Sequence, residues 1–555
     1  MQEAPTLDTP ARTRRARLRA FARGSAPAPT EWLLAVASAG LLVFSFPDFN
    51  LWPLAWVGLV PLILAVARKP RGPQAFLLGW TTGTLFFYGS CYWLTHAMVH
   101  YGGIPRWLAY LLLVPAPLLT GLFPALWALL LAHTSARCGL GRALLLAPPA
   151  WAAFEWARLG LTGQLWNALG YSQAYTPALI QPARWGGVYA VGFLIAAVNA
   201  ALAYAVWRRS VRACAALASV AALVALTIFL SNRADDSAQQ PATHPARQAT
   251  QPGALVVGVQ PNVPVEFGRS SEQTAALVRR HLTMSTDAFR AWDAAHAPTD
   301  VKIPRVVIWP ESPMNFAYAR DDAFRQTLAR FARENRTYVL FNSLEPAPAG
   351  GFYNSAVMVD AEGRLVAQYD KIRLLPFGEY VPLPRWLPLA WMLSGVVGDF
   401  TPGEKYPLMP LGENGGAGLR AGVFICFESA FPAIARRFAD EGADVLVNIS
   451  NDGYLGRTAV MRQHLANVVF RAVETNRPVL RVTNTGISAR ITPRGEVLDA
   501  TEGFTPAALT WTVERAGAGK TFYTKHGDMF PAICVALTAL GLAATFKVRL
   551  KTGPR

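Results

Sequence analysis

Hydrophobic residues are spread unevenly along the chain, with long apolar runs in the first 230 positions and the last 30. About 20 apolar residues are needed for a helix to cross a bilayer. The pattern therefore predicts seven apolar spans, then a large polar region, then an eighth span. The predicted spans are 31–46, 52–67, 75–97, 107–134, 143–160, 187–207, 214–231 and 529–546. The first two are short, so tilted or re-entrant helices remain open there.

The polar region has a different pattern, in which short β-branched runs alternate with helical stretches, as is typical of a mixed α/β domain. The predicted strands are 254–260, 305–309, 338–342, 354–360, 365–370, 420–426, 443–449, 478–484 and 487–492. The predicted helices are 272–295, 321–336, 431–441 and 459–476. The predicted domain order is a basic segment (1–30), a membrane domain (31–231), a linker (232–253), an α/β domain (254–528), a closing transmembrane helix (529–546) and a basic tail (547–555).

The distribution of charged residues predicts how the spans are oriented in the membrane. The formal net charge is +17, and much of the excess lies in short Arg and Lys clusters at the N-terminus and after the second, fourth, sixth and last spans. This alternation follows the positive-inside rule, and it predicts eight crossings with both ends in the cytoplasm and the α/β domain outside. A nucleic-acid-binding protein would instead show a basic stripe on a soluble domain, so the pattern argues against that class.

Three reactive side chains stand where predicted strands end. Glu311 follows Trp309-Pro, Lys371 follows Tyr369-Asp, and Cys426 closes an apolar run with no other cysteine between residues 215 and 533. Singly, each has an ordinary alternative, as a surface carboxylate, a solvated lysine or a packed thiol. Together, a nucleophilic thiol, a carboxylate base and an ammonium that stabilises an oxyanion predict covalent catalysis at an acyl carbon.

The phrases around these residues resemble the nitrilase superfamily, whose catalytic triad is Glu-Lys-Cys and whose fold is an αββα sandwich. The phrase Leu375-Pro-Phe-Gly-Glu379-Tyr-Val-Pro382, flanked by membrane spans, resembles more narrowly the apolipoprotein N-acyltransferase family. The resemblance implies a multi-span α-helical membrane domain joined to a nitrilase-like α/β domain outside the cytoplasm. It implies Glu311 as base, Lys371 as oxyanion and thiolate stabiliser, and Cys426 as nucleophile.

The same resemblance implies a reaction and a location. A membrane phospholipid would acylate Cys426, and the thioester would then acylate the α-amine of an S-diacylglyceryl cysteine at the N-terminus of a lipoprotein. We expect a monomer in the bacterial inner membrane, with its catalytic domain in the periplasm and with no cofactor and no metal. Glu379 and Glu428 match further acidic positions of the family, which leaves them either supporting roles or structural ion pairing.

Two segments suggest contacts with the substrates. The family motif Asn-Asp-x-Trp-Phe-Gly is here Asn-Asp-Gly-Tyr454-Leu455-Gly, whose bulky side chains keep a lid or acyl-contacting role open. The apolar segment 382–400 contains Trp386 and Trp391. It reads either as an arm that dips into the headgroup region or as an ordinary buried loop.

Other interpretations stay open at this point. Glu155 and Arg158 lie on one face of the fifth span, where they could pair with each other or seat a lipid headgroup. A membrane-tethered amidohydrolase would use the same triad and pass the acyl group to water. A non-catalytic membrane protein, such as a transporter or scaffold, would need the outer domain only for binding.

Overall fold

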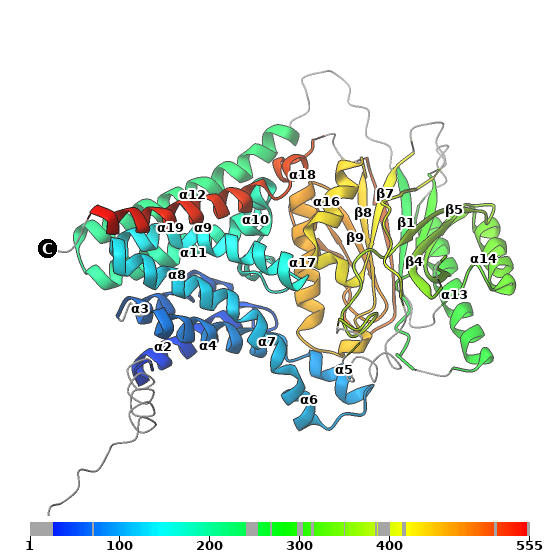
Figure 1. Ribbon diagram of the computed structural model, residues 1–555. Helices are drawn as coiled ribbons and strands as arrows, with labels where there is room; N and C mark the ends of the chain where they lie inside the picture. Colours follow the sequence, from blue (N-terminus) through cyan, green and yellow to red (C-terminus); the bar gives the residue numbers. More distant parts are fainter. Residues whose placement is uncertain are drawn as a thin grey trace, which may run out of the picture.

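Two six-stranded sheets pack face to face in the α/β domain, and helices cover their outer faces (Figure 1). The computed structural model describes residues 26–68, 72–239, 253–266, 269–296, 303–311, 316–348, 350–382, 386, 400–412, 418–515 and 519–551. The first sheet has the order β12-β1-β2-β3-β4-β5 and the second the order β11-β10-β9-β8-β7-β6. This is the αββα sandwich that the resemblance to the nitrilase superfamily implied.

The strands of the first sheet are β1 (Ala254–Gln260), β2 (Arg305–Ile308), β3 (Thr337–Pro346), β4 (Phe352–Val359), β5 (Leu365–Asp370) and β12 (Ala507–Val513). Those of the second are β6 (Leu408–Pro410), β7 (Arg420–Ile425), β8 (Val445–Ser450), β9 (Val479–Thr483), β10 (Ala489–Ile491) and β11 (Val497–Leu498). The covering helices are α13 (Ser271–Ala295) and α14 (Asp322–Asn335) on one side, and α16 (Pro432–Asp440) and α17 (Val460–Thr475) on the other.

The central strands are parallel and buried on both faces. β1, β2 and β3 run parallel in the first sheet, and β7, β8 and β9 run parallel in the second. In β1, Leu255 and Val257 pack in the cluster that includes residues of α13 and α14, while Ala254 and Val256 pack in the cluster shared with the second sheet. Burial on both faces explains why these strands read as continuous apolar runs.

The membrane domain is a bundle of helices on one side of the sandwich (Figure 1). Its helices are α2 (Pro29–Ser45), η1 (Trp52–Trp56), α3 (Val60–Arg68), α4 (Gly72–Ser90), α5 (Leu94–His100), α6 (Arg106–Leu113), α7 (Pro115–Thr120), α8 (Leu122–Cys138), α9 (Leu140–Thr162), η2 (Leu169–Gln173), α10 (Pro177–Ile180), α11 (Ala183–Arg208) and α12 (Val211–Gln239). After the α/β domain, α18 (Phe522–His526) and α19 (Met529–Lys551) return the chain to the bundle.

Among the described residues, four helical stretches are long and apolar enough to cross a membrane. They are 106–138, 183–208, 211–233 and 529–546, and two shorter apolar helices cover 29–45 and 52–68. The chain is therefore a membrane protein, and the count of eight crossings stays a prediction. The predicted span 75–97 is divided, since α4 ends at Ser90 and α5 begins at Leu94.

The elements that the sequence missed are short or only partly buried. β6 has three residues and β11 has two, so both are too short to show the alternation of hydrophobic and polar residues that marks a strand. Most residues of β12 are only half-buried. α18 has five residues. In addition, α12 continues to Gln239 and so runs into the predicted linker from residue 232.

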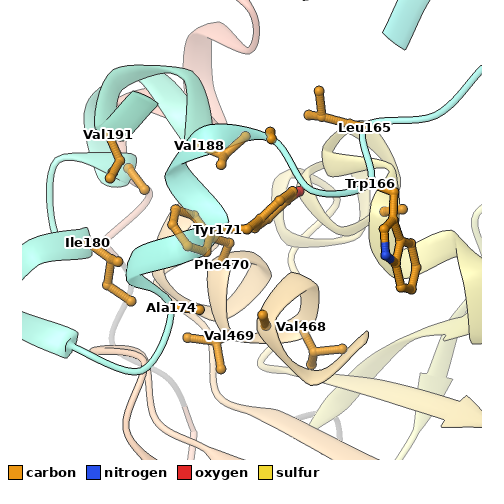
Figure 2. Packing of buried hydrophobic residues seen from close by; sticks show 14 of the residues in the cluster. Leu165, Trp166, Tyr171, Ala174, Ile180, Val188, Val191, Val468, Val469 and Phe470 are labelled. Carbon is orange, nitrogen blue, oxygen red and sulfur yellow. The ribbon is translucent and has the colours of Figure 1, made fainter. Parts of the chain in front are cut away.

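The two domains meet along α17. Figure 2 shows Tyr171 of the membrane domain beside Phe470 of α17, and their ring centroids are 5.0 Å apart. Val468 and Val469 lie on the same helix, and all three α17 side chains are buried. The carboxyl end of β7 also lies at the interface between the domains, because Phe427 stacks on Trp166 of the membrane domain with ring centroids 6.2 Å apart.

Candidate active site

Cys426 stands at the turn between β7 and the short helix η3 (Cys426–Ala430). Its φ is +49°, a left-handed conformation that is uncommon for a residue other than glycine. Such strained residues persist only where the surrounding structure holds them, and they gather at functional sites. The side chain is half-buried, as expected for a nucleophile that must still meet a substrate.

Lys371 follows β5, and its ammonium lies between two carboxylates. Its Nζ is 2.9 Å from Oε1 of Glu379 and 3.4 Å from Oε1 of Glu311, and the side chain is 1% exposed. The Asn354 amide donates to the same two oxygens, at 2.7 Å to Glu379 and 2.9 Å to Glu311. The structure thus brings Glu311, Lys371 and Glu379 into one hydrogen-bonded group.

The charges in this group set the protonation of the site. Burial raises the pKa of the Cys426 thiol, and Glu311 raises it further, while Lys371 lowers it. For Lys371, burial opposes the charged form, but the carboxylates of Glu311 and Glu379 outweigh burial and raise its pKa. The lysine is therefore an ammonium, and the resting thiol is protonated, so its activation requires a neighbouring base.

Glu428 ties the two segments that carry Lys371 and Cys426 together. Its Oε1 accepts hydrogen bonds from the backbone N–H groups of Ile372 (2.7 Å) and Arg373 (3.0 Å), and its Oε2 accepts from Ile425 (2.7 Å). The Tyr369 hydroxyl donates to both oxygens, at 2.8 and 2.9 Å. Burial raises the pKa of Glu428 to about 7, against these hydrogen bonds.

A second polar chain lies behind Cys426, and sequence reasoning missed it. His464 of α17 is 2.8 Å from Asp452 through Nδ1 and 2.9 Å from the carbonyl oxygen of Cys426 through Nε2. Arg481 of β9 donates to the other Asp452 oxygen at 2.9 Å. Asp452 belongs to the Asn-Asp-Gly phrase and was therefore visible in the sequence, whereas His464 and Arg481 lie inside regular elements with no motif to mark them.

Comparisons with known proteins agree with this architecture. The chain matches the family model of the apolipoprotein N-acyltransferase N-terminal domain over residues 38–201, and that of carbon-nitrogen hydrolases over residues 271–521. It is 34% identical to the apolipoprotein N-acyltransferase of Geobacter metallireducens, over 93% of this chain and 95% of that protein. It is 31% identical to that of Rhizobium meliloti, over 91% and 95%. The chain belongs to the apolipoprotein N-acyltransferase family.

Solved structures also align with part of this acyltransferase. An amidase from Nesterenkonia sp. aligns with a TM-score of 0.33 at 16% identity, over 51% of this chain and 96% of that one. Nit3 of Saccharomyces cerevisiae, a nitrilase-superfamily member, aligns with a TM-score of 0.36 at 18% identity, over 48% and 93%.

The predicted substrate-contacting residues of the acyltransferase lie in different surroundings. Tyr454 is 37% exposed and meets Tyr101 of the membrane domain edge-on, with ring centroids 5.6 Å apart. Leu455 is partly buried against the core. Trp386 is 80% exposed, which does not fit a buried loop at that position. Trp391 lies outside the described residues.

Glu155 and Arg158 of α9 each hold the loop that leads to η2. Glu155 accepts a hydrogen bond from the backbone N–H of Leu169 at 2.6 Å. Arg158 donates to the carbonyl oxygen of Trp166 at 2.9 Å and to the amide oxygen of Gln164 at 3.2 Å. Both side chains are buried, so the contacts that the structure records favour a loop-holding role over a headgroup site.

Proposed function

We propose that this acyltransferase moves an acyl chain from a membrane phospholipid, through a thioester on Cys426, to the α-amine of an S-diacylglyceryl cysteine at a lipoprotein N-terminus. The observation that carries the proposal is the group formed by Lys371 and Glu311, 3.4 Å apart, within electrostatic reach of the Cys426 thiol. The membrane domain beside it supports a substrate whose chains stay in lipid.

In the first step, Glu311 takes the thiol proton and the Cys426 sulfur attacks the ester carbonyl carbon of the phospholipid. The Lys371 ammonium stabilises the negative charge that develops on the carbonyl oxygen. The C–O bond then breaks, and Glu311 returns its proton to the departing lysophospholipid oxygen. The product of this step is a thioester, with one C–S bond formed and one C–O bond broken.

In the second step, the neutral α-amine of the lipoprotein attacks the thioester carbonyl carbon. Glu311 accepts a proton from the amine, the C–N bond forms and the C–S bond breaks. The sulfur leaves as a thiolate beside Lys371 and regains a proton from Glu311. Because the lysophospholipid leaves before the amine attacks the acyl-enzyme, the reaction follows a ping-pong order.

We assign supporting roles to the other two glutamates. Glu379 keeps Lys371 charged and in place, through the 2.9 Å contact between Oε1 and Nζ. Glu428 fixes the backbone on both sides of the reacting groups through its contacts with Ile372 and Ile425. In this proposal the enzyme is a monomer in the bacterial inner membrane, and its site opens on the periplasmic side.

Intact-protein mass spectrometry tests the proposal. The full-length enzyme is incubated with phospholipid and no acceptor, and we expect a mass increase of one acyl group that is absent from Cys426→Ser. Addition of a diacylglyceryl peptide then moves the acyl group to the peptide amine. An unmodified Cys426 would contradict the proposal. Free fatty acid with no acylated peptide would instead favour the amidohydrolase alternative.

A further inference from the structure

A single glutamine of α17 joins the catalytic domain to three separate segments of the membrane domain. Gln463 donates through Nε2 to the carbonyl oxygens of Pro47 and Ser90, each at 2.9 Å. Its Oε1 accepts from the indole N–H groups of Trp93 (3.0 Å) and Trp166 (2.9 Å). It also accepts from the side-chain amide of Asn167, at 3.4 Å.

These bonds use the full capacity of the amide, whose two N–H groups each have an acceptor. The side chain is 3% exposed, so a partner lost here is not replaced by bulk water. Gln463 therefore fixes the position of the first turn of α17 relative to the membrane domain.

The next residue of α17 reaches the nucleophile. His464 Nε2 lies 2.9 Å from the carbonyl oxygen of Cys426, and its ring centroid is 5.6 Å from that of Trp166. Trp166 also stacks on Phe427, the residue after the nucleophile, at 6.2 Å. One membrane-domain indole thus touches Gln463, His464 and Phe427 together.

These contacts matter because the backbone of Cys426 has a strained conformation that its neighbours must hold. Its φ of +49° is strained for a residue that carries a Cβ, so neighbouring bonds must hold it. The bond from His464 to the Cys426 carbonyl is such a restraint, and the position of His464 in turn depends on where α17 begins. A shift of about 1 Å in a reacting atom can lower a rate by on the order of 10²-fold.

We propose that Gln463 and His464 are positioning residues through which the membrane domain sets the geometry of the Cys426 nucleophile. The link runs from Trp166 to Gln463, along one residue of α17 to His464, and on to the Cys426 carbonyl. The proposal rests on the proposed role of Cys426 as nucleophile. In this proposal the membrane domain shapes the catalytic site in addition to anchoring the enzyme in the membrane.

The test uses full-length enzyme in detergent micelles and two variants, Trp166→Phe and Gln463→Met. Trp166→Phe keeps an aromatic ring and removes the indole N–H, which makes it the milder change. Two rates are measured: thioester formation from phospholipid, and alkylation of Cys426 by iodoacetamide, followed on the Cys426 peptide by mass spectrometry. We expect both rates to fall between about tenfold and 10²-fold, with an unchanged dependence on phospholipid concentration.

Phe470→Leu is the matched control. Phe470 is buried at the same interface, beside Tyr171, and it has no recorded contact with Cys426. We expect it to lower the melting temperature and leave Cys426 alkylation at the wild-type rate. Wild-type alkylation in both Trp166→Phe and Gln463→Met would overturn the proposal, as would an equal slowing in Phe470→Leu. Alkylation needs no acyl donor, so absence of a thioester in the wild type would count against the proposed function alone.

Discussion

Buried charges are matched differently in the two halves of this acyltransferase. In the catalytic domain, buried charged side chains pair with side chains of opposite charge. Lys371 lies between two carboxylates, and Arg481 pairs with Asp452 at 2.9 Å. In the membrane domain, Glu155 and Arg158 act on each other electrostatically, but their hydrogen bonds go to neutral backbone and amide groups. Opposite charges in direct contact tune the proton affinity of their neighbours, which catalysis uses, while charged side chains that donate to or accept from backbone groups fix the shape of a loop.

The largest effect should follow from removing the central cation of the catalytic domain. Lys371→Met leaves Glu311 and Glu379 beside each other with no ammonium and removes the proposed stabiliser of the oxyanion. We expect the rate of thioester formation to fall by about 10³-fold, measured by intact-protein mass spectrometry. Lys520→Met is the control, because Lys520 pairs with Asp440 at 2.8 Å where both side chains are more than a third exposed. A wild-type rate in Lys371→Met would remove this residue from the mechanism.

The same substitution in both halves should sharpen the comparison. Both carboxylate oxygens of Glu428 accept hydrogen bonds. Glu428→Gln replaces one of these oxygens by an NH₂ group, which then faces donors and cannot accept from them. We expect a loss of about 2 kcal/mol in unfolding free energy and a slower thioester step. Glu155→Gln keeps an oxygen for the Leu169 N–H, so we expect a change below about 1 kcal/mol. Denaturant titration in detergent measures both, and equal losses would contradict the comparison.

The sequence predicted the residues of the catalytic motifs better than it predicted the contacts between the two domains. Glu311, Lys371 and Cys426 could be proposed as a site because each follows a strand within a recognisable phrase, although β5 pairs antiparallel with β4 and β7 belongs to the second sheet. The family match places the chain among apolipoprotein N-acyltransferases, as the resemblance implied. The contact between Gln463 and Trp166 joins residues 297 positions apart in two domains. Hydrophobic periodicity carries no information on such a contact, so neither residue could be assigned from the sequence.

Acid should weaken the charge pairing between Asp452, Arg481 and His464, which lies behind Cys426. Burial opposes the charge of Asp452, but Arg481 and His464 outweigh it and lower its pKa from 3.8 to about 2. Because its pKa is lower in the folded state, ionised Asp452 stabilises the fold at pH values above its unfolded pKa of 3.8. This stabilisation is lost as the pH falls from 3.8 through 2. We expect the difference in unfolding free energy between wild type and Asp452→Asn to shrink by about 2 kcal/mol across that window. A difference that is independent of pH would show that Asp452 is not held ionised by its partners.

The smallest predicted effect concerns the exposed Trp386 of the catalytic domain. Trp386 is 80% exposed although it is a large apolar side chain, and an exposed indole is suited to the headgroup region of a bilayer. If the segment dips into lipid, Trp386→Asp should slow turnover of phospholipid in vesicles severalfold. It should leave turnover unchanged for a short-chain phospholipid that is soluble in water, because that donor needs no contact with a surface. The two substrates separate anchoring from chemistry: equal slowing on both would place Trp386 at the reacting groups, and no slowing on vesicles would argue against a lipid-dipping arm.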